Sequence, residues 1–176
     1  MQRLGATLTA QHTGADATAL PLGNGDTFPS LRVAAVGGGT ISLPSDLAGS
    51  YGVVLFYRGS WCPYCNAQLT AFHRASDELT EVGAKVVALS VDDETTSAAL
   101  VAKHHLSFSV GHSAKADAIA SATGAFTSAD PHHLQSTGFV LSPGGTVITA
   151  VYSSGAIGRL VPEDVLGLLR YIQSQQ

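Results

Sequence analysis

The sequence contains few charged residues. Only 12% of its 176 residues are charged, whereas 45% are hydrophobic, and the net charge is −4. The nine Lys and Arg residues are scattered along the chain rather than gathered into a stripe that could follow nucleic-acid phosphates. We therefore expect no nucleic-acid partner, and one globular domain with a sizeable core.

Long apolar runs are missing as well. No run of about 18 apolar residues occurs, and the N-terminus lacks the apolar stretch of a secretory signal behind a basic start. We expect a cytoplasmic protein with no membrane partner. Residues 1–21, rich in Ala, Thr and Gly, are predicted to be a weakly structured N-terminal segment that precedes a single domain at residues 22–176.

Cysteine is rare and clustered. The chain has two cysteines, Cys62 and Cys65, within the stretch RGSWCPYC at residues 58–65. In a reducing cytoplasm a structural disulfide is not expected, so a Cys-x-x-Cys pair indicates redox chemistry or half of a zinc site. Because no second such pair is present, the spacing favours redox chemistry, and we predict no metal site and no other cofactor.

An apolar strand is predicted directly before this pair. Tyr51–Tyr57 (YGVVLFY) is a near-continuous apolar run with β-branched and aromatic residues, which is typical of a central strand buried on both faces. Pro63 suits the first position of a helix, where its missing N–H is not needed. This predicts Cys62 as the N-cap of a helix and Cys65 as its third residue.

One face of this helix is predicted to be buried. Residues with helical spacing share that face: Cys65, Leu69, Phe72, Ser76 and Leu79. Gln68 falls on a different face, among polar residues. Gly83 is expected to end the helix.

Further strands and helices alternate along the chain. Strands are predicted at 31–36, 40–43, 85–91, 107–110, 138–142 and 146–152, and helices at about 95–105, 114–122 and 162–173, with a single helical turn at 44–49. The first two strands flank three glycines, as in a short hairpin. This order predicts an α/β sandwich around a mixed sheet.

The position of the two thiols suggests how one of them is activated. Only a thiolate attacks a disulfide or a peroxide O–O bond, and a free thiol is mostly protonated at neutral pH. The unpaired N–H groups and the dipole at a helix N-terminus favour an anion, so the pKa of Cys62 is expected to be lowered, and Arg58 can add a positive charge nearby. Either thiol could attack first, with the other resolving the product.

Three stretches together resemble a known family. A Cys-x-x-Cys at a strand-to-helix junction resembles the thioredoxin fold. The chain also resembles the peroxiredoxin-like branch of the alkyl hydroperoxide reductase C/thiol-specific antioxidant (AhpC/TSA, redoxin) family in three stretches: FYRGSWCPYCNAQL (56–69), GDTFP (25–29) and FVLSPGG (139–145). The resemblance covers roughly residues 22–174. It implies a thioredoxin-like three-layer sandwich, with a mixed sheet flanked by helices and an N-terminal β-hairpin extension.

The resemblance also assigns positions in the site. Peroxiredoxins carry Pro-x-x-x-Thr-x-x-Cys after the strand, and this register puts Arg58 at the Pro, Cys62 at the Thr and Cys65 at the peroxidatic Cys. The family places an Arg three residues before the Phe of a later strand, and Ser136 stands there, before Phe139. In the thioredoxin fold the loop before that strand faces the thiols, so His132 or His133 could act as a base.

These observations predict a thiol-dependent peroxidase that reduces hydrogen peroxide or organic hydroperoxides through a cycle between dithiol and disulfide. Its candidate residues are, for catalysis, Cys62, Cys65 and Arg58 and, for substrate binding, Trp61, Tyr64 and Ser136; Trp61 and Tyr64 could equally serve only in packing. The expected partner is an external thiol reductant, such as a thioredoxin-like protein or a low-molecular-weight thiol, and a homodimer is an open possibility. The alternatives are a thiol–disulfide oxidoreductase acting on protein or small-molecule disulfides, and a non-catalytic thioredoxin-fold module.

Overall fold

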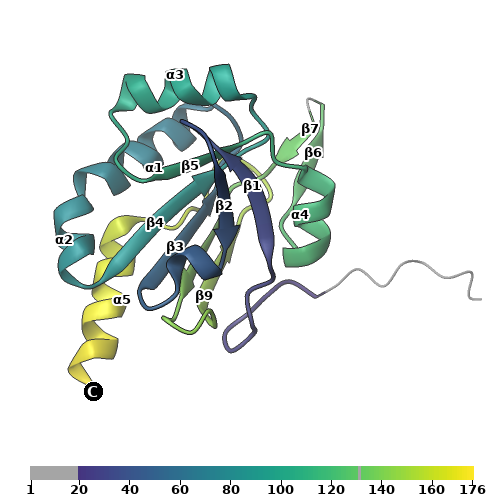
Figure 1. Cartoon of the computed structure of the whole chain (residues 1–176). Helices are drawn as coiled ribbons and strands as arrows, with labels where there is room; N and C mark the ends of the chain where they lie inside the picture. The colour runs from purple at the N-terminus through teal and green to yellow at the C-terminus, as the bar shows by residue number, and fades with distance from the viewer. Residues whose placement is uncertain (1–19, 131) are drawn as a thin grey trace, which may run out of the picture.

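A seven-stranded mixed sheet with the strand order β2-β1-β5-β4-β3-β8-β9 organises the chain (Figure 1). The computed structural model describes residues 20–130 and 132–176. Its strands are β1 (Leu31–Ala35), β2 (Thr40–Leu43), β3 (Tyr51–Phe56), β4 (Ala84–Leu89), β5 (Ser109–His112), β6 (Thr127–Ala129), β7 (His132–Leu134), β8 (Thr137–Leu141) and β9 (Val147–Tyr152). Its helices are the 3-10 turn η1 (Ser45–Leu47), α1 (Pro63–Arg74), α2 (Ser76–Glu81), α3 (Glu94–His104), α4 (Ala116–Thr123) and α5 (Pro162–Ser174).

Strand β3 is the centre of the sheet, as its apolar run predicts. It pairs parallel with β4 and antiparallel with β8. Its side chains alternate between two apolar clusters, with Val53 and Leu55 in one and Val54 and Phe56 in the other. A strand buried on both faces has no polar side, which explains the unbroken apolar sequence.

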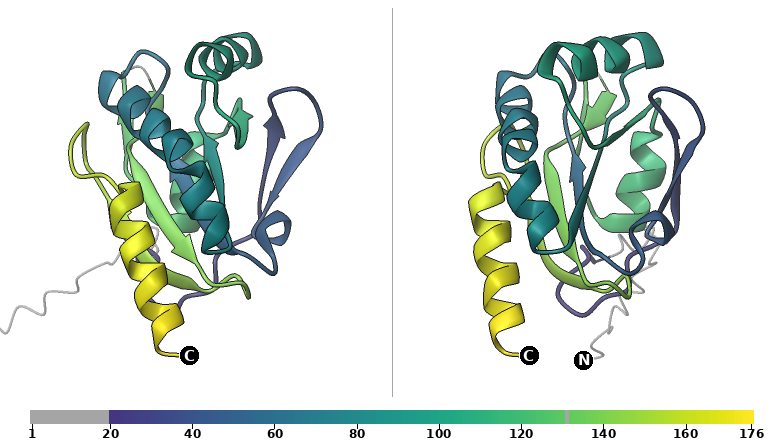
Figure 2. Two further views of the ribbon diagram at one scale, coloured as in Figure 1. Left: turned by 90° about the vertical axis from the view of Figure 1, so that its left-hand side faces the viewer. Right: turned by 60° about the vertical axis from the view of Figure 1, so that its left-hand side comes forward.

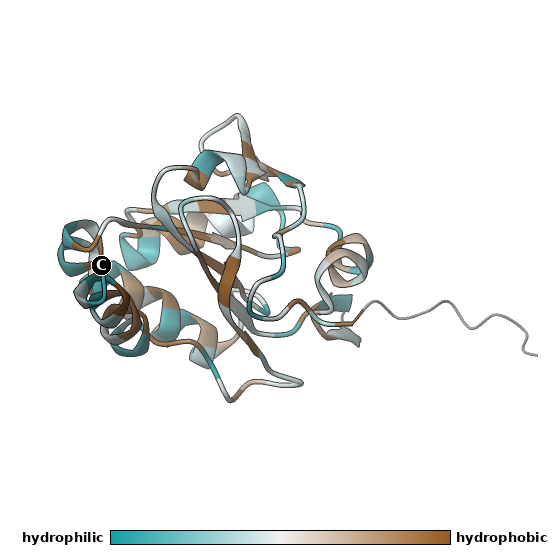
Figure 3. Ribbon diagram, turned by 90° about the horizontal axis from the view of Figure 1, so that it is seen from below, coloured by the Kyte–Doolittle hydropathy of each residue, from teal (hydrophilic) through white to brown (hydrophobic). Residues whose placement is uncertain are grey.

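Helices cover both faces of this sheet (Figure 2). The cluster that includes Leu55 takes in apolar side chains of α1, α2, α3 and α5, whereas the cluster that includes Phe56 takes in α4, η1 and the first hairpin. In Figure 3 the strands are largely hydrophobic, while hydrophilic residues recur along the surrounding helices. The predicted α/β sandwich with helices flanking a mixed sheet is confirmed.

The N-terminal hairpin adds to the sheet. Strands β1 and β2 pair antiparallel, and β1 pairs with β5 through Ala34 and Ala35. From Leu22 onward the chain is attached to the domain, because the Leu22 N–H donates to the Thr123 carbonyl at 3.0 Å. Most of the predicted weakly structured segment, residues 1–19, lies outside the described residues. No helix in the described ranges is long and apolar enough to cross a membrane.

Some local predictions were wrong. The helix expected to run to Gly83 is interrupted at Ala75, where the Ser76 hydroxyl donates to the His73 carbonyl in place of a regular helical arrangement. The short hairpin of β6 and β7 was not predicted, because three-residue strands carry too little pattern. Boundaries of the other elements differ by one or two residues, which is usual where helix and strand ends fray.

Candidate redox site at the start of helix α1

The junction between β3 and α1 presents Cys62 and Cys65. Cys62 is the N-cap of α1 with extended backbone angles, and Pro63 occupies the first helical turn. The Cys62 sulfur accepts the backbone N–H of Cys65 at 3.4 Å. The predicted cap is confirmed in position and in role, since a capping side chain accepts an N–H of the first turn.

Both cysteines are free thiols and both side chains are fully buried. The Cys65 sulfur accepts the backbone N–H of Arg58 at 3.2 Å. Each sulfur therefore accepts one backbone N–H, a contact that by itself favours the thiolate form.

The Arg58 side chain folds back over the loop, as the sequence suggested. Its Nη1 lies 3.7 Å from the Cys62 sulfur, and its Nε donates to the Gln135 side-chain carbonyl at 2.9 Å. Its guanidinium also stacks over the Trp61 ring, 4.9 Å from the ring centroid. Arg58 is thus held in place by Gln135 and Trp61 beside Cys62.

A second arginine, which the sequence reasoning missed, reaches both thiols. Arg159 lies in the loop between β9 and α5, and its Nη2 is 3.1 Å from the Cys65 sulfur and 3.6 Å from the Cys62 sulfur. It is separated from Cys65 by 94 positions, so no local motif marks it.

Gln68 was predicted to lie off the buried face of its helix, and this was wrong. Only 6% of its surface is exposed. Its amide oxygen accepts from Arg159 Nη1 and its amide nitrogen donates to the Leu160 carbonyl, both at 2.8 Å. A buried amide is tolerated because both of its ends are paired.

The two guanidinium groups beside the thiols are not paired with a carboxylate in the described ranges. Within the described ranges, the ion pairs join Arg170 with Glu78 and His132 with Asp117. Neither Arg58 nor Arg159 therefore has a carboxylate partner there, and their nearest anionic neighbour would be a thiolate.

The pKa values of the two thiols move in opposite directions. Burial acts to raise the pKa of Cys62, but the Cys65 thiol and backbone N–H, Arg58 and Arg159 outweigh it and hold this pKa below the ordinary thiol value. Burial raises the pKa of Cys65, and the hydrogen bond that its S–H gives to Cys62 raises it further. Cys62 is therefore the thiol prepared to ionise.

The three residues expected to bind substrate differ in position. Trp61 and Tyr64 are about half exposed; Trp61 directly precedes Cys62, and Tyr64 lies between the two cysteines. The Trp61 ring lies so close to Gly59 that a Cβ there would meet its Nε1 at 2.2 Å. Ser136 is buried, and its carbonyl accepts the Ser153 N–H at 3.0 Å. In the described part of the chain, no hydrogen bond joins the Ser136 hydroxyl to either thiol.

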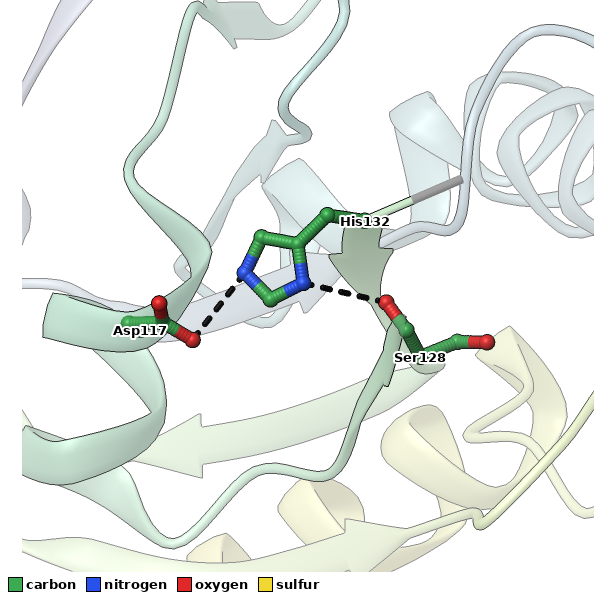
Figure 4. A network of polar contacts seen from close by, with 3 residues as sticks. All are labelled: Asp117, Ser128 and His132. Atoms are coloured by element: carbon green, nitrogen blue, oxygen red, sulfur yellow. Dashed lines mark hydrogen bonds and ion pairs between the residues drawn. The ribbon is translucent and has the colours of Figure 1, made fainter. Parts of the chain in front are cut away.

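The two adjacent histidines have different neighbours. His132 contacts Asp117 through Nε2 at 3.0 Å and the Ser128 carbonyl through Nδ1 at 3.1 Å (Figure 4). His133 is buried and packs edge to face against Trp61, with ring centroids 5.1 Å apart. Residues 20–130 and 132–176 contain no group of three or more His, Cys, Asp or Glu side chains arranged to hold a metal ion.

Residues 24–150 match the AhpC/TSA family. The chain belongs to the AhpC/TSA family. It is 28% identical over 145 residues to a peroxiredoxin of Treponema denticola, covering 80% of this chain and 69% of that one, and 26% identical over 145 residues to a peroxiredoxin of Methanothermobacter marburgensis, covering 80% and 68%.

Two solved structures have the same fold as this chain. AhpC of Mycobacterium tuberculosis superposes with a TM-score of 0.75 at 23% identity, covering 89% of this chain and 96% of that one. The peroxidoxin BcpB of the same organism gives a TM-score of 0.73 at 20% identity, covering 86% and 98%. The thioredoxin-like fold expected for an AhpC/TSA member is confirmed by these neighbours.

Proposed function

We propose that the protein is a thiol-dependent peroxidase in which Cys62 is the nucleophile and Cys65 the resolving thiol. Its family makes it an oxidoreductase of the thiol-peroxidase type, and the proposal adds the roles of individual residues. The main support for this proposal is the set of donors around the Cys62 sulfur: the Cys65 backbone N–H at 3.4 Å, Arg159 Nη2 at 3.6 Å and Arg58 Nη1 at 3.7 Å. Three donors around one buried sulfur favour its thiolate.

In the first step the Cys62 thiolate attacks the terminal oxygen of a hydroperoxide. The S–O bond forms as the O–O bond breaks, Cys62 becomes a sulfenic acid, and the leaving oxygen takes up a proton to leave as water or an alcohol. The Arg58 guanidinium lies beside the Cys62 sulfur and can donate to the oxygen on which charge develops. In this role Arg58 replaces the family arginine whose position Ser136 occupies.

In the second step Cys65 attacks the sulfenic acid. A disulfide forms between Cys62 and Cys65, and the hydroxyl of the sulfenic acid leaves as water with the Cys65 proton. Positions i and i+3 at the start of a helix bring the two Cα atoms within disulfide reach. An external dithiol, or two monothiols, then reduces the disulfide and is oxidised in turn.

Burial of the two thiols favours a peroxide over a protein disulfide as substrate. Neither sulfur has exposed surface. A hydroperoxide presents a head of two oxygen atoms, whereas each sulfur of a protein disulfide carries a further chain that must enter the same site. We propose that Trp61 and Tyr64, both half exposed beside the dithiol, border the approach to the site.

Stopped-flow mixing tests this proposal. The chain has one tryptophan, Trp61, which stacks on Arg58, so its fluorescence reports oxidation at Cys62. Rates should be measured with hydrogen peroxide, cumene hydroperoxide and a dithiopyridine disulfide. We expect both peroxides to react far faster than they do with free cysteine. Peroxide rates no better than those of free cysteine, with a fast disulfide reaction, would assign the protein to the thiol–disulfide oxidoreductases instead.

A further inference from the structure

The two arginines approach the dithiol from different elements and do not contact it alike. Arg58 comes from the loop after β3, and its side chain reaches Cys62 alone, at 3.7 Å. Arg159 comes from the loop before α5, and its Nη2 is nearer to Cys65, at 3.1 Å, than to Cys62, at 3.6 Å. The guanidinium of Arg58 therefore contacts Cys62, whereas that of Arg159 lies mainly against Cys65.

Arg159 is also fixed more firmly than a loop arginine usually is. Its Nε donates to the Ala156 carbonyl and its Nη1 to the Gln68 amide oxygen, each at 2.8 Å. The other end of the Gln68 amide donates to the Leu160 carbonyl, also at 2.8 Å. Gln68 thus binds both the side chain of Arg159 and the backbone next to it.

The choice of a neutral amide at position 68 matters for charge. A carboxylate there would form an ion pair with Arg159 and offset its positive charge, whereas an amide oxygen accepts the same hydrogen bond and leaves the charge available. Gln68 lies one helical turn after Cys65, on the same helix as the thiol that Arg159 contacts. Helix α1 therefore carries Cys65 and also, through Gln68, holds in place the Arg159 guanidinium that contacts the Cys65 sulfur.

We propose that Arg159, held by Gln68, serves the second half of the reaction by stabilising the Cys65 thiolate as it attacks the sulfenic acid on Cys62. The inference rests on the proposed function. Cys65 must lose its proton to become a nucleophile, and that proton leaves with the sulfenic hydroxyl as water while the S–S bond forms. Arg159 contacts a reacting sulfur and is a catalytic residue in this step. Gln68 contacts neither sulfur and is a positioning residue.

The test separates the two steps in time. Reduced protein is mixed rapidly with hydrogen peroxide; Trp61 fluorescence follows both phases, and dimedone added at set times traps the sulfenic acid for mass spectrometry. Arg159→Leu should slow disulfide formation by about ten- to a hundredfold, as expected for loss of one charge-assisted hydrogen bond, and sulfenic acid should accumulate. The peroxide step, where Arg58 remains, should slow by a smaller factor.

Gln68→Leu should slow the same phase, because Arg159 loses one of its anchors. Gln173→Leu is the matched control: Gln173 also donates its side-chain amide from a helix to a backbone carbonyl, that of Val82 at 2.8 Å, but has no contact with the thiols in the described structure. It can lower stability, yet both phases should keep their wild-type rates. A purely structural role for Gln68 would make the two glutamine variants alike.

A double variant tests whether Gln68 acts through Arg159. Gln68→Leu added to Arg159→Leu should slow disulfide formation no further, since the group that Gln68 positions is already gone. Arg159→Lys, which keeps the charge without the planar group, provides a second readout if Arg159→Leu fails to fold, and should retain part of the resolution rate.

Two results would overturn the inference. One is that Arg159→Leu and Arg159→Lys both form the disulfide at the wild-type rate. The other is that they slow the peroxide step more than disulfide formation, which would place Arg159 on the first reaction. Both outcomes differ from failure of the proposed function, which would show as absence of a fast peroxide phase in the wild type itself.

Discussion

Two helices of this protein begin after adjacent parallel strands, and both are capped by an ionisable side chain. Helix α1 follows β3 and is capped by Cys62, whose sulfur accepts the Cys65 N–H at 3.4 Å. Helix α3 follows β4 and is capped by Asp93, whose carboxylate accepts the Thr96 N–H at 2.8 Å. In both cases a side chain accepts an N–H of the first turn, and in both the pKa lies below its ordinary value.

The surroundings of the two caps differ. Asp93 is exposed, and hydrogen bonds from the Thr96 backbone and side chain are the main causes of its lowered pKa. Cys62 is fully buried, with Arg58 and Arg159 beside it. Charges interact more strongly away from water. The same capping arrangement thus only stabilises a helix at Asp93. At Cys62, burial and two arginines without carboxylate partners are added, and the capping group becomes a nucleophile.

The largest effect is expected from removing the Cys62 thiol. Cys62→Ser should lower the rate of peroxide reduction by at least about a thousandfold, because a serine hydroxyl is not ionised at neutral pH and cannot take up the oxygen. Cys65→Ser is the matched variant: it should still consume about one equivalent of peroxide and then stop as sulfenic acid. A peroxide-consumption assay with mass spectrometry distinguishes them, and a reactive Cys62→Ser beside an inert Cys65→Ser would reverse the two roles.

The next largest effect is expected from removing the Arg58 guanidinium beside Cys62. Arg58→Ala should slow reaction with hydrogen peroxide and cumene hydroperoxide by about tenfold or more, from loss of a charge-assisted hydrogen bond in the transition state. Reaction with a dithiopyridine disulfide should fall less, because disulfide exchange needs mainly thiolate and access. Arg170→Ala, which removes an exposed arginine paired with Glu78, is the control and should leave all three rates unchanged. Equal losses on all three substrates would mean that Arg58 acts only on the thiol pKa.

A smaller effect should separate the two ways of replacing Cys65. Its thiol donates a hydrogen bond that lowers the pKa of Cys62. Cys65→Ser keeps an O–H that can donate, whereas Cys65→Ala does not. The pKa of Cys62, followed by thiolate absorbance, should therefore be higher in Cys65→Ala than in Cys65→Ser. Identical titrations would show that the helix N–H and the two arginines alone set this pKa.

The smallest effect is expected at the exposed cap. Asp93→Ala should lower the urea midpoint at neutral pH and leave peroxide rates unchanged. Because the folded-state pKa of Asp93 is lowered, its contribution is present above the unfolded-state pKa of about 3.9 and is lost as the pH falls through the folded value. The difference in midpoint between wild type and variant should shrink in that acidic range. A loss of peroxide activity in Asp93→Ala would remove the distinction between the two caps.

The site could be predicted where its signals are local. Pro63 after Cys62 predicted the start of α1 and the capping thiol, because a proline at the first helical position restricts where the helix can begin. The apolar run of β3 predicted the central strand that leads into it. Arg58, four residues before Cys62, could be expected beside the thiols from its position in the loop.

The rest of the site depends on contacts that no local pattern encodes. Arg159 and Gln68 meet across 91 positions, and only the packing of the loop before α5 against α1 brings them together. From helical spacing alone, Gln68 resembled a polar surface residue, since periodicity describes one helix and not the partner that covers it. The break at Ala75 has a different origin: a hydrogen bond between near neighbours, from the Ser76 hydroxyl to the His73 carbonyl, competes with regular helix geometry without altering the apolar spacing.

The central claim is that Cys62 carries the lowered pKa, and alkylation against pH tests it most directly. The rate of reaction with iodoacetamide should be measured across pH for Cys62→Ser and Cys65→Ser under reducing conditions. The account predicts that Cys65→Ser, which retains Cys62, reaches half of its maximal rate below the pH typical of a free thiol, and that Cys62→Ser, which retains Cys65, does so above it. A low midpoint found only in Cys62→Ser would contradict the account and make Cys65 the nucleophile.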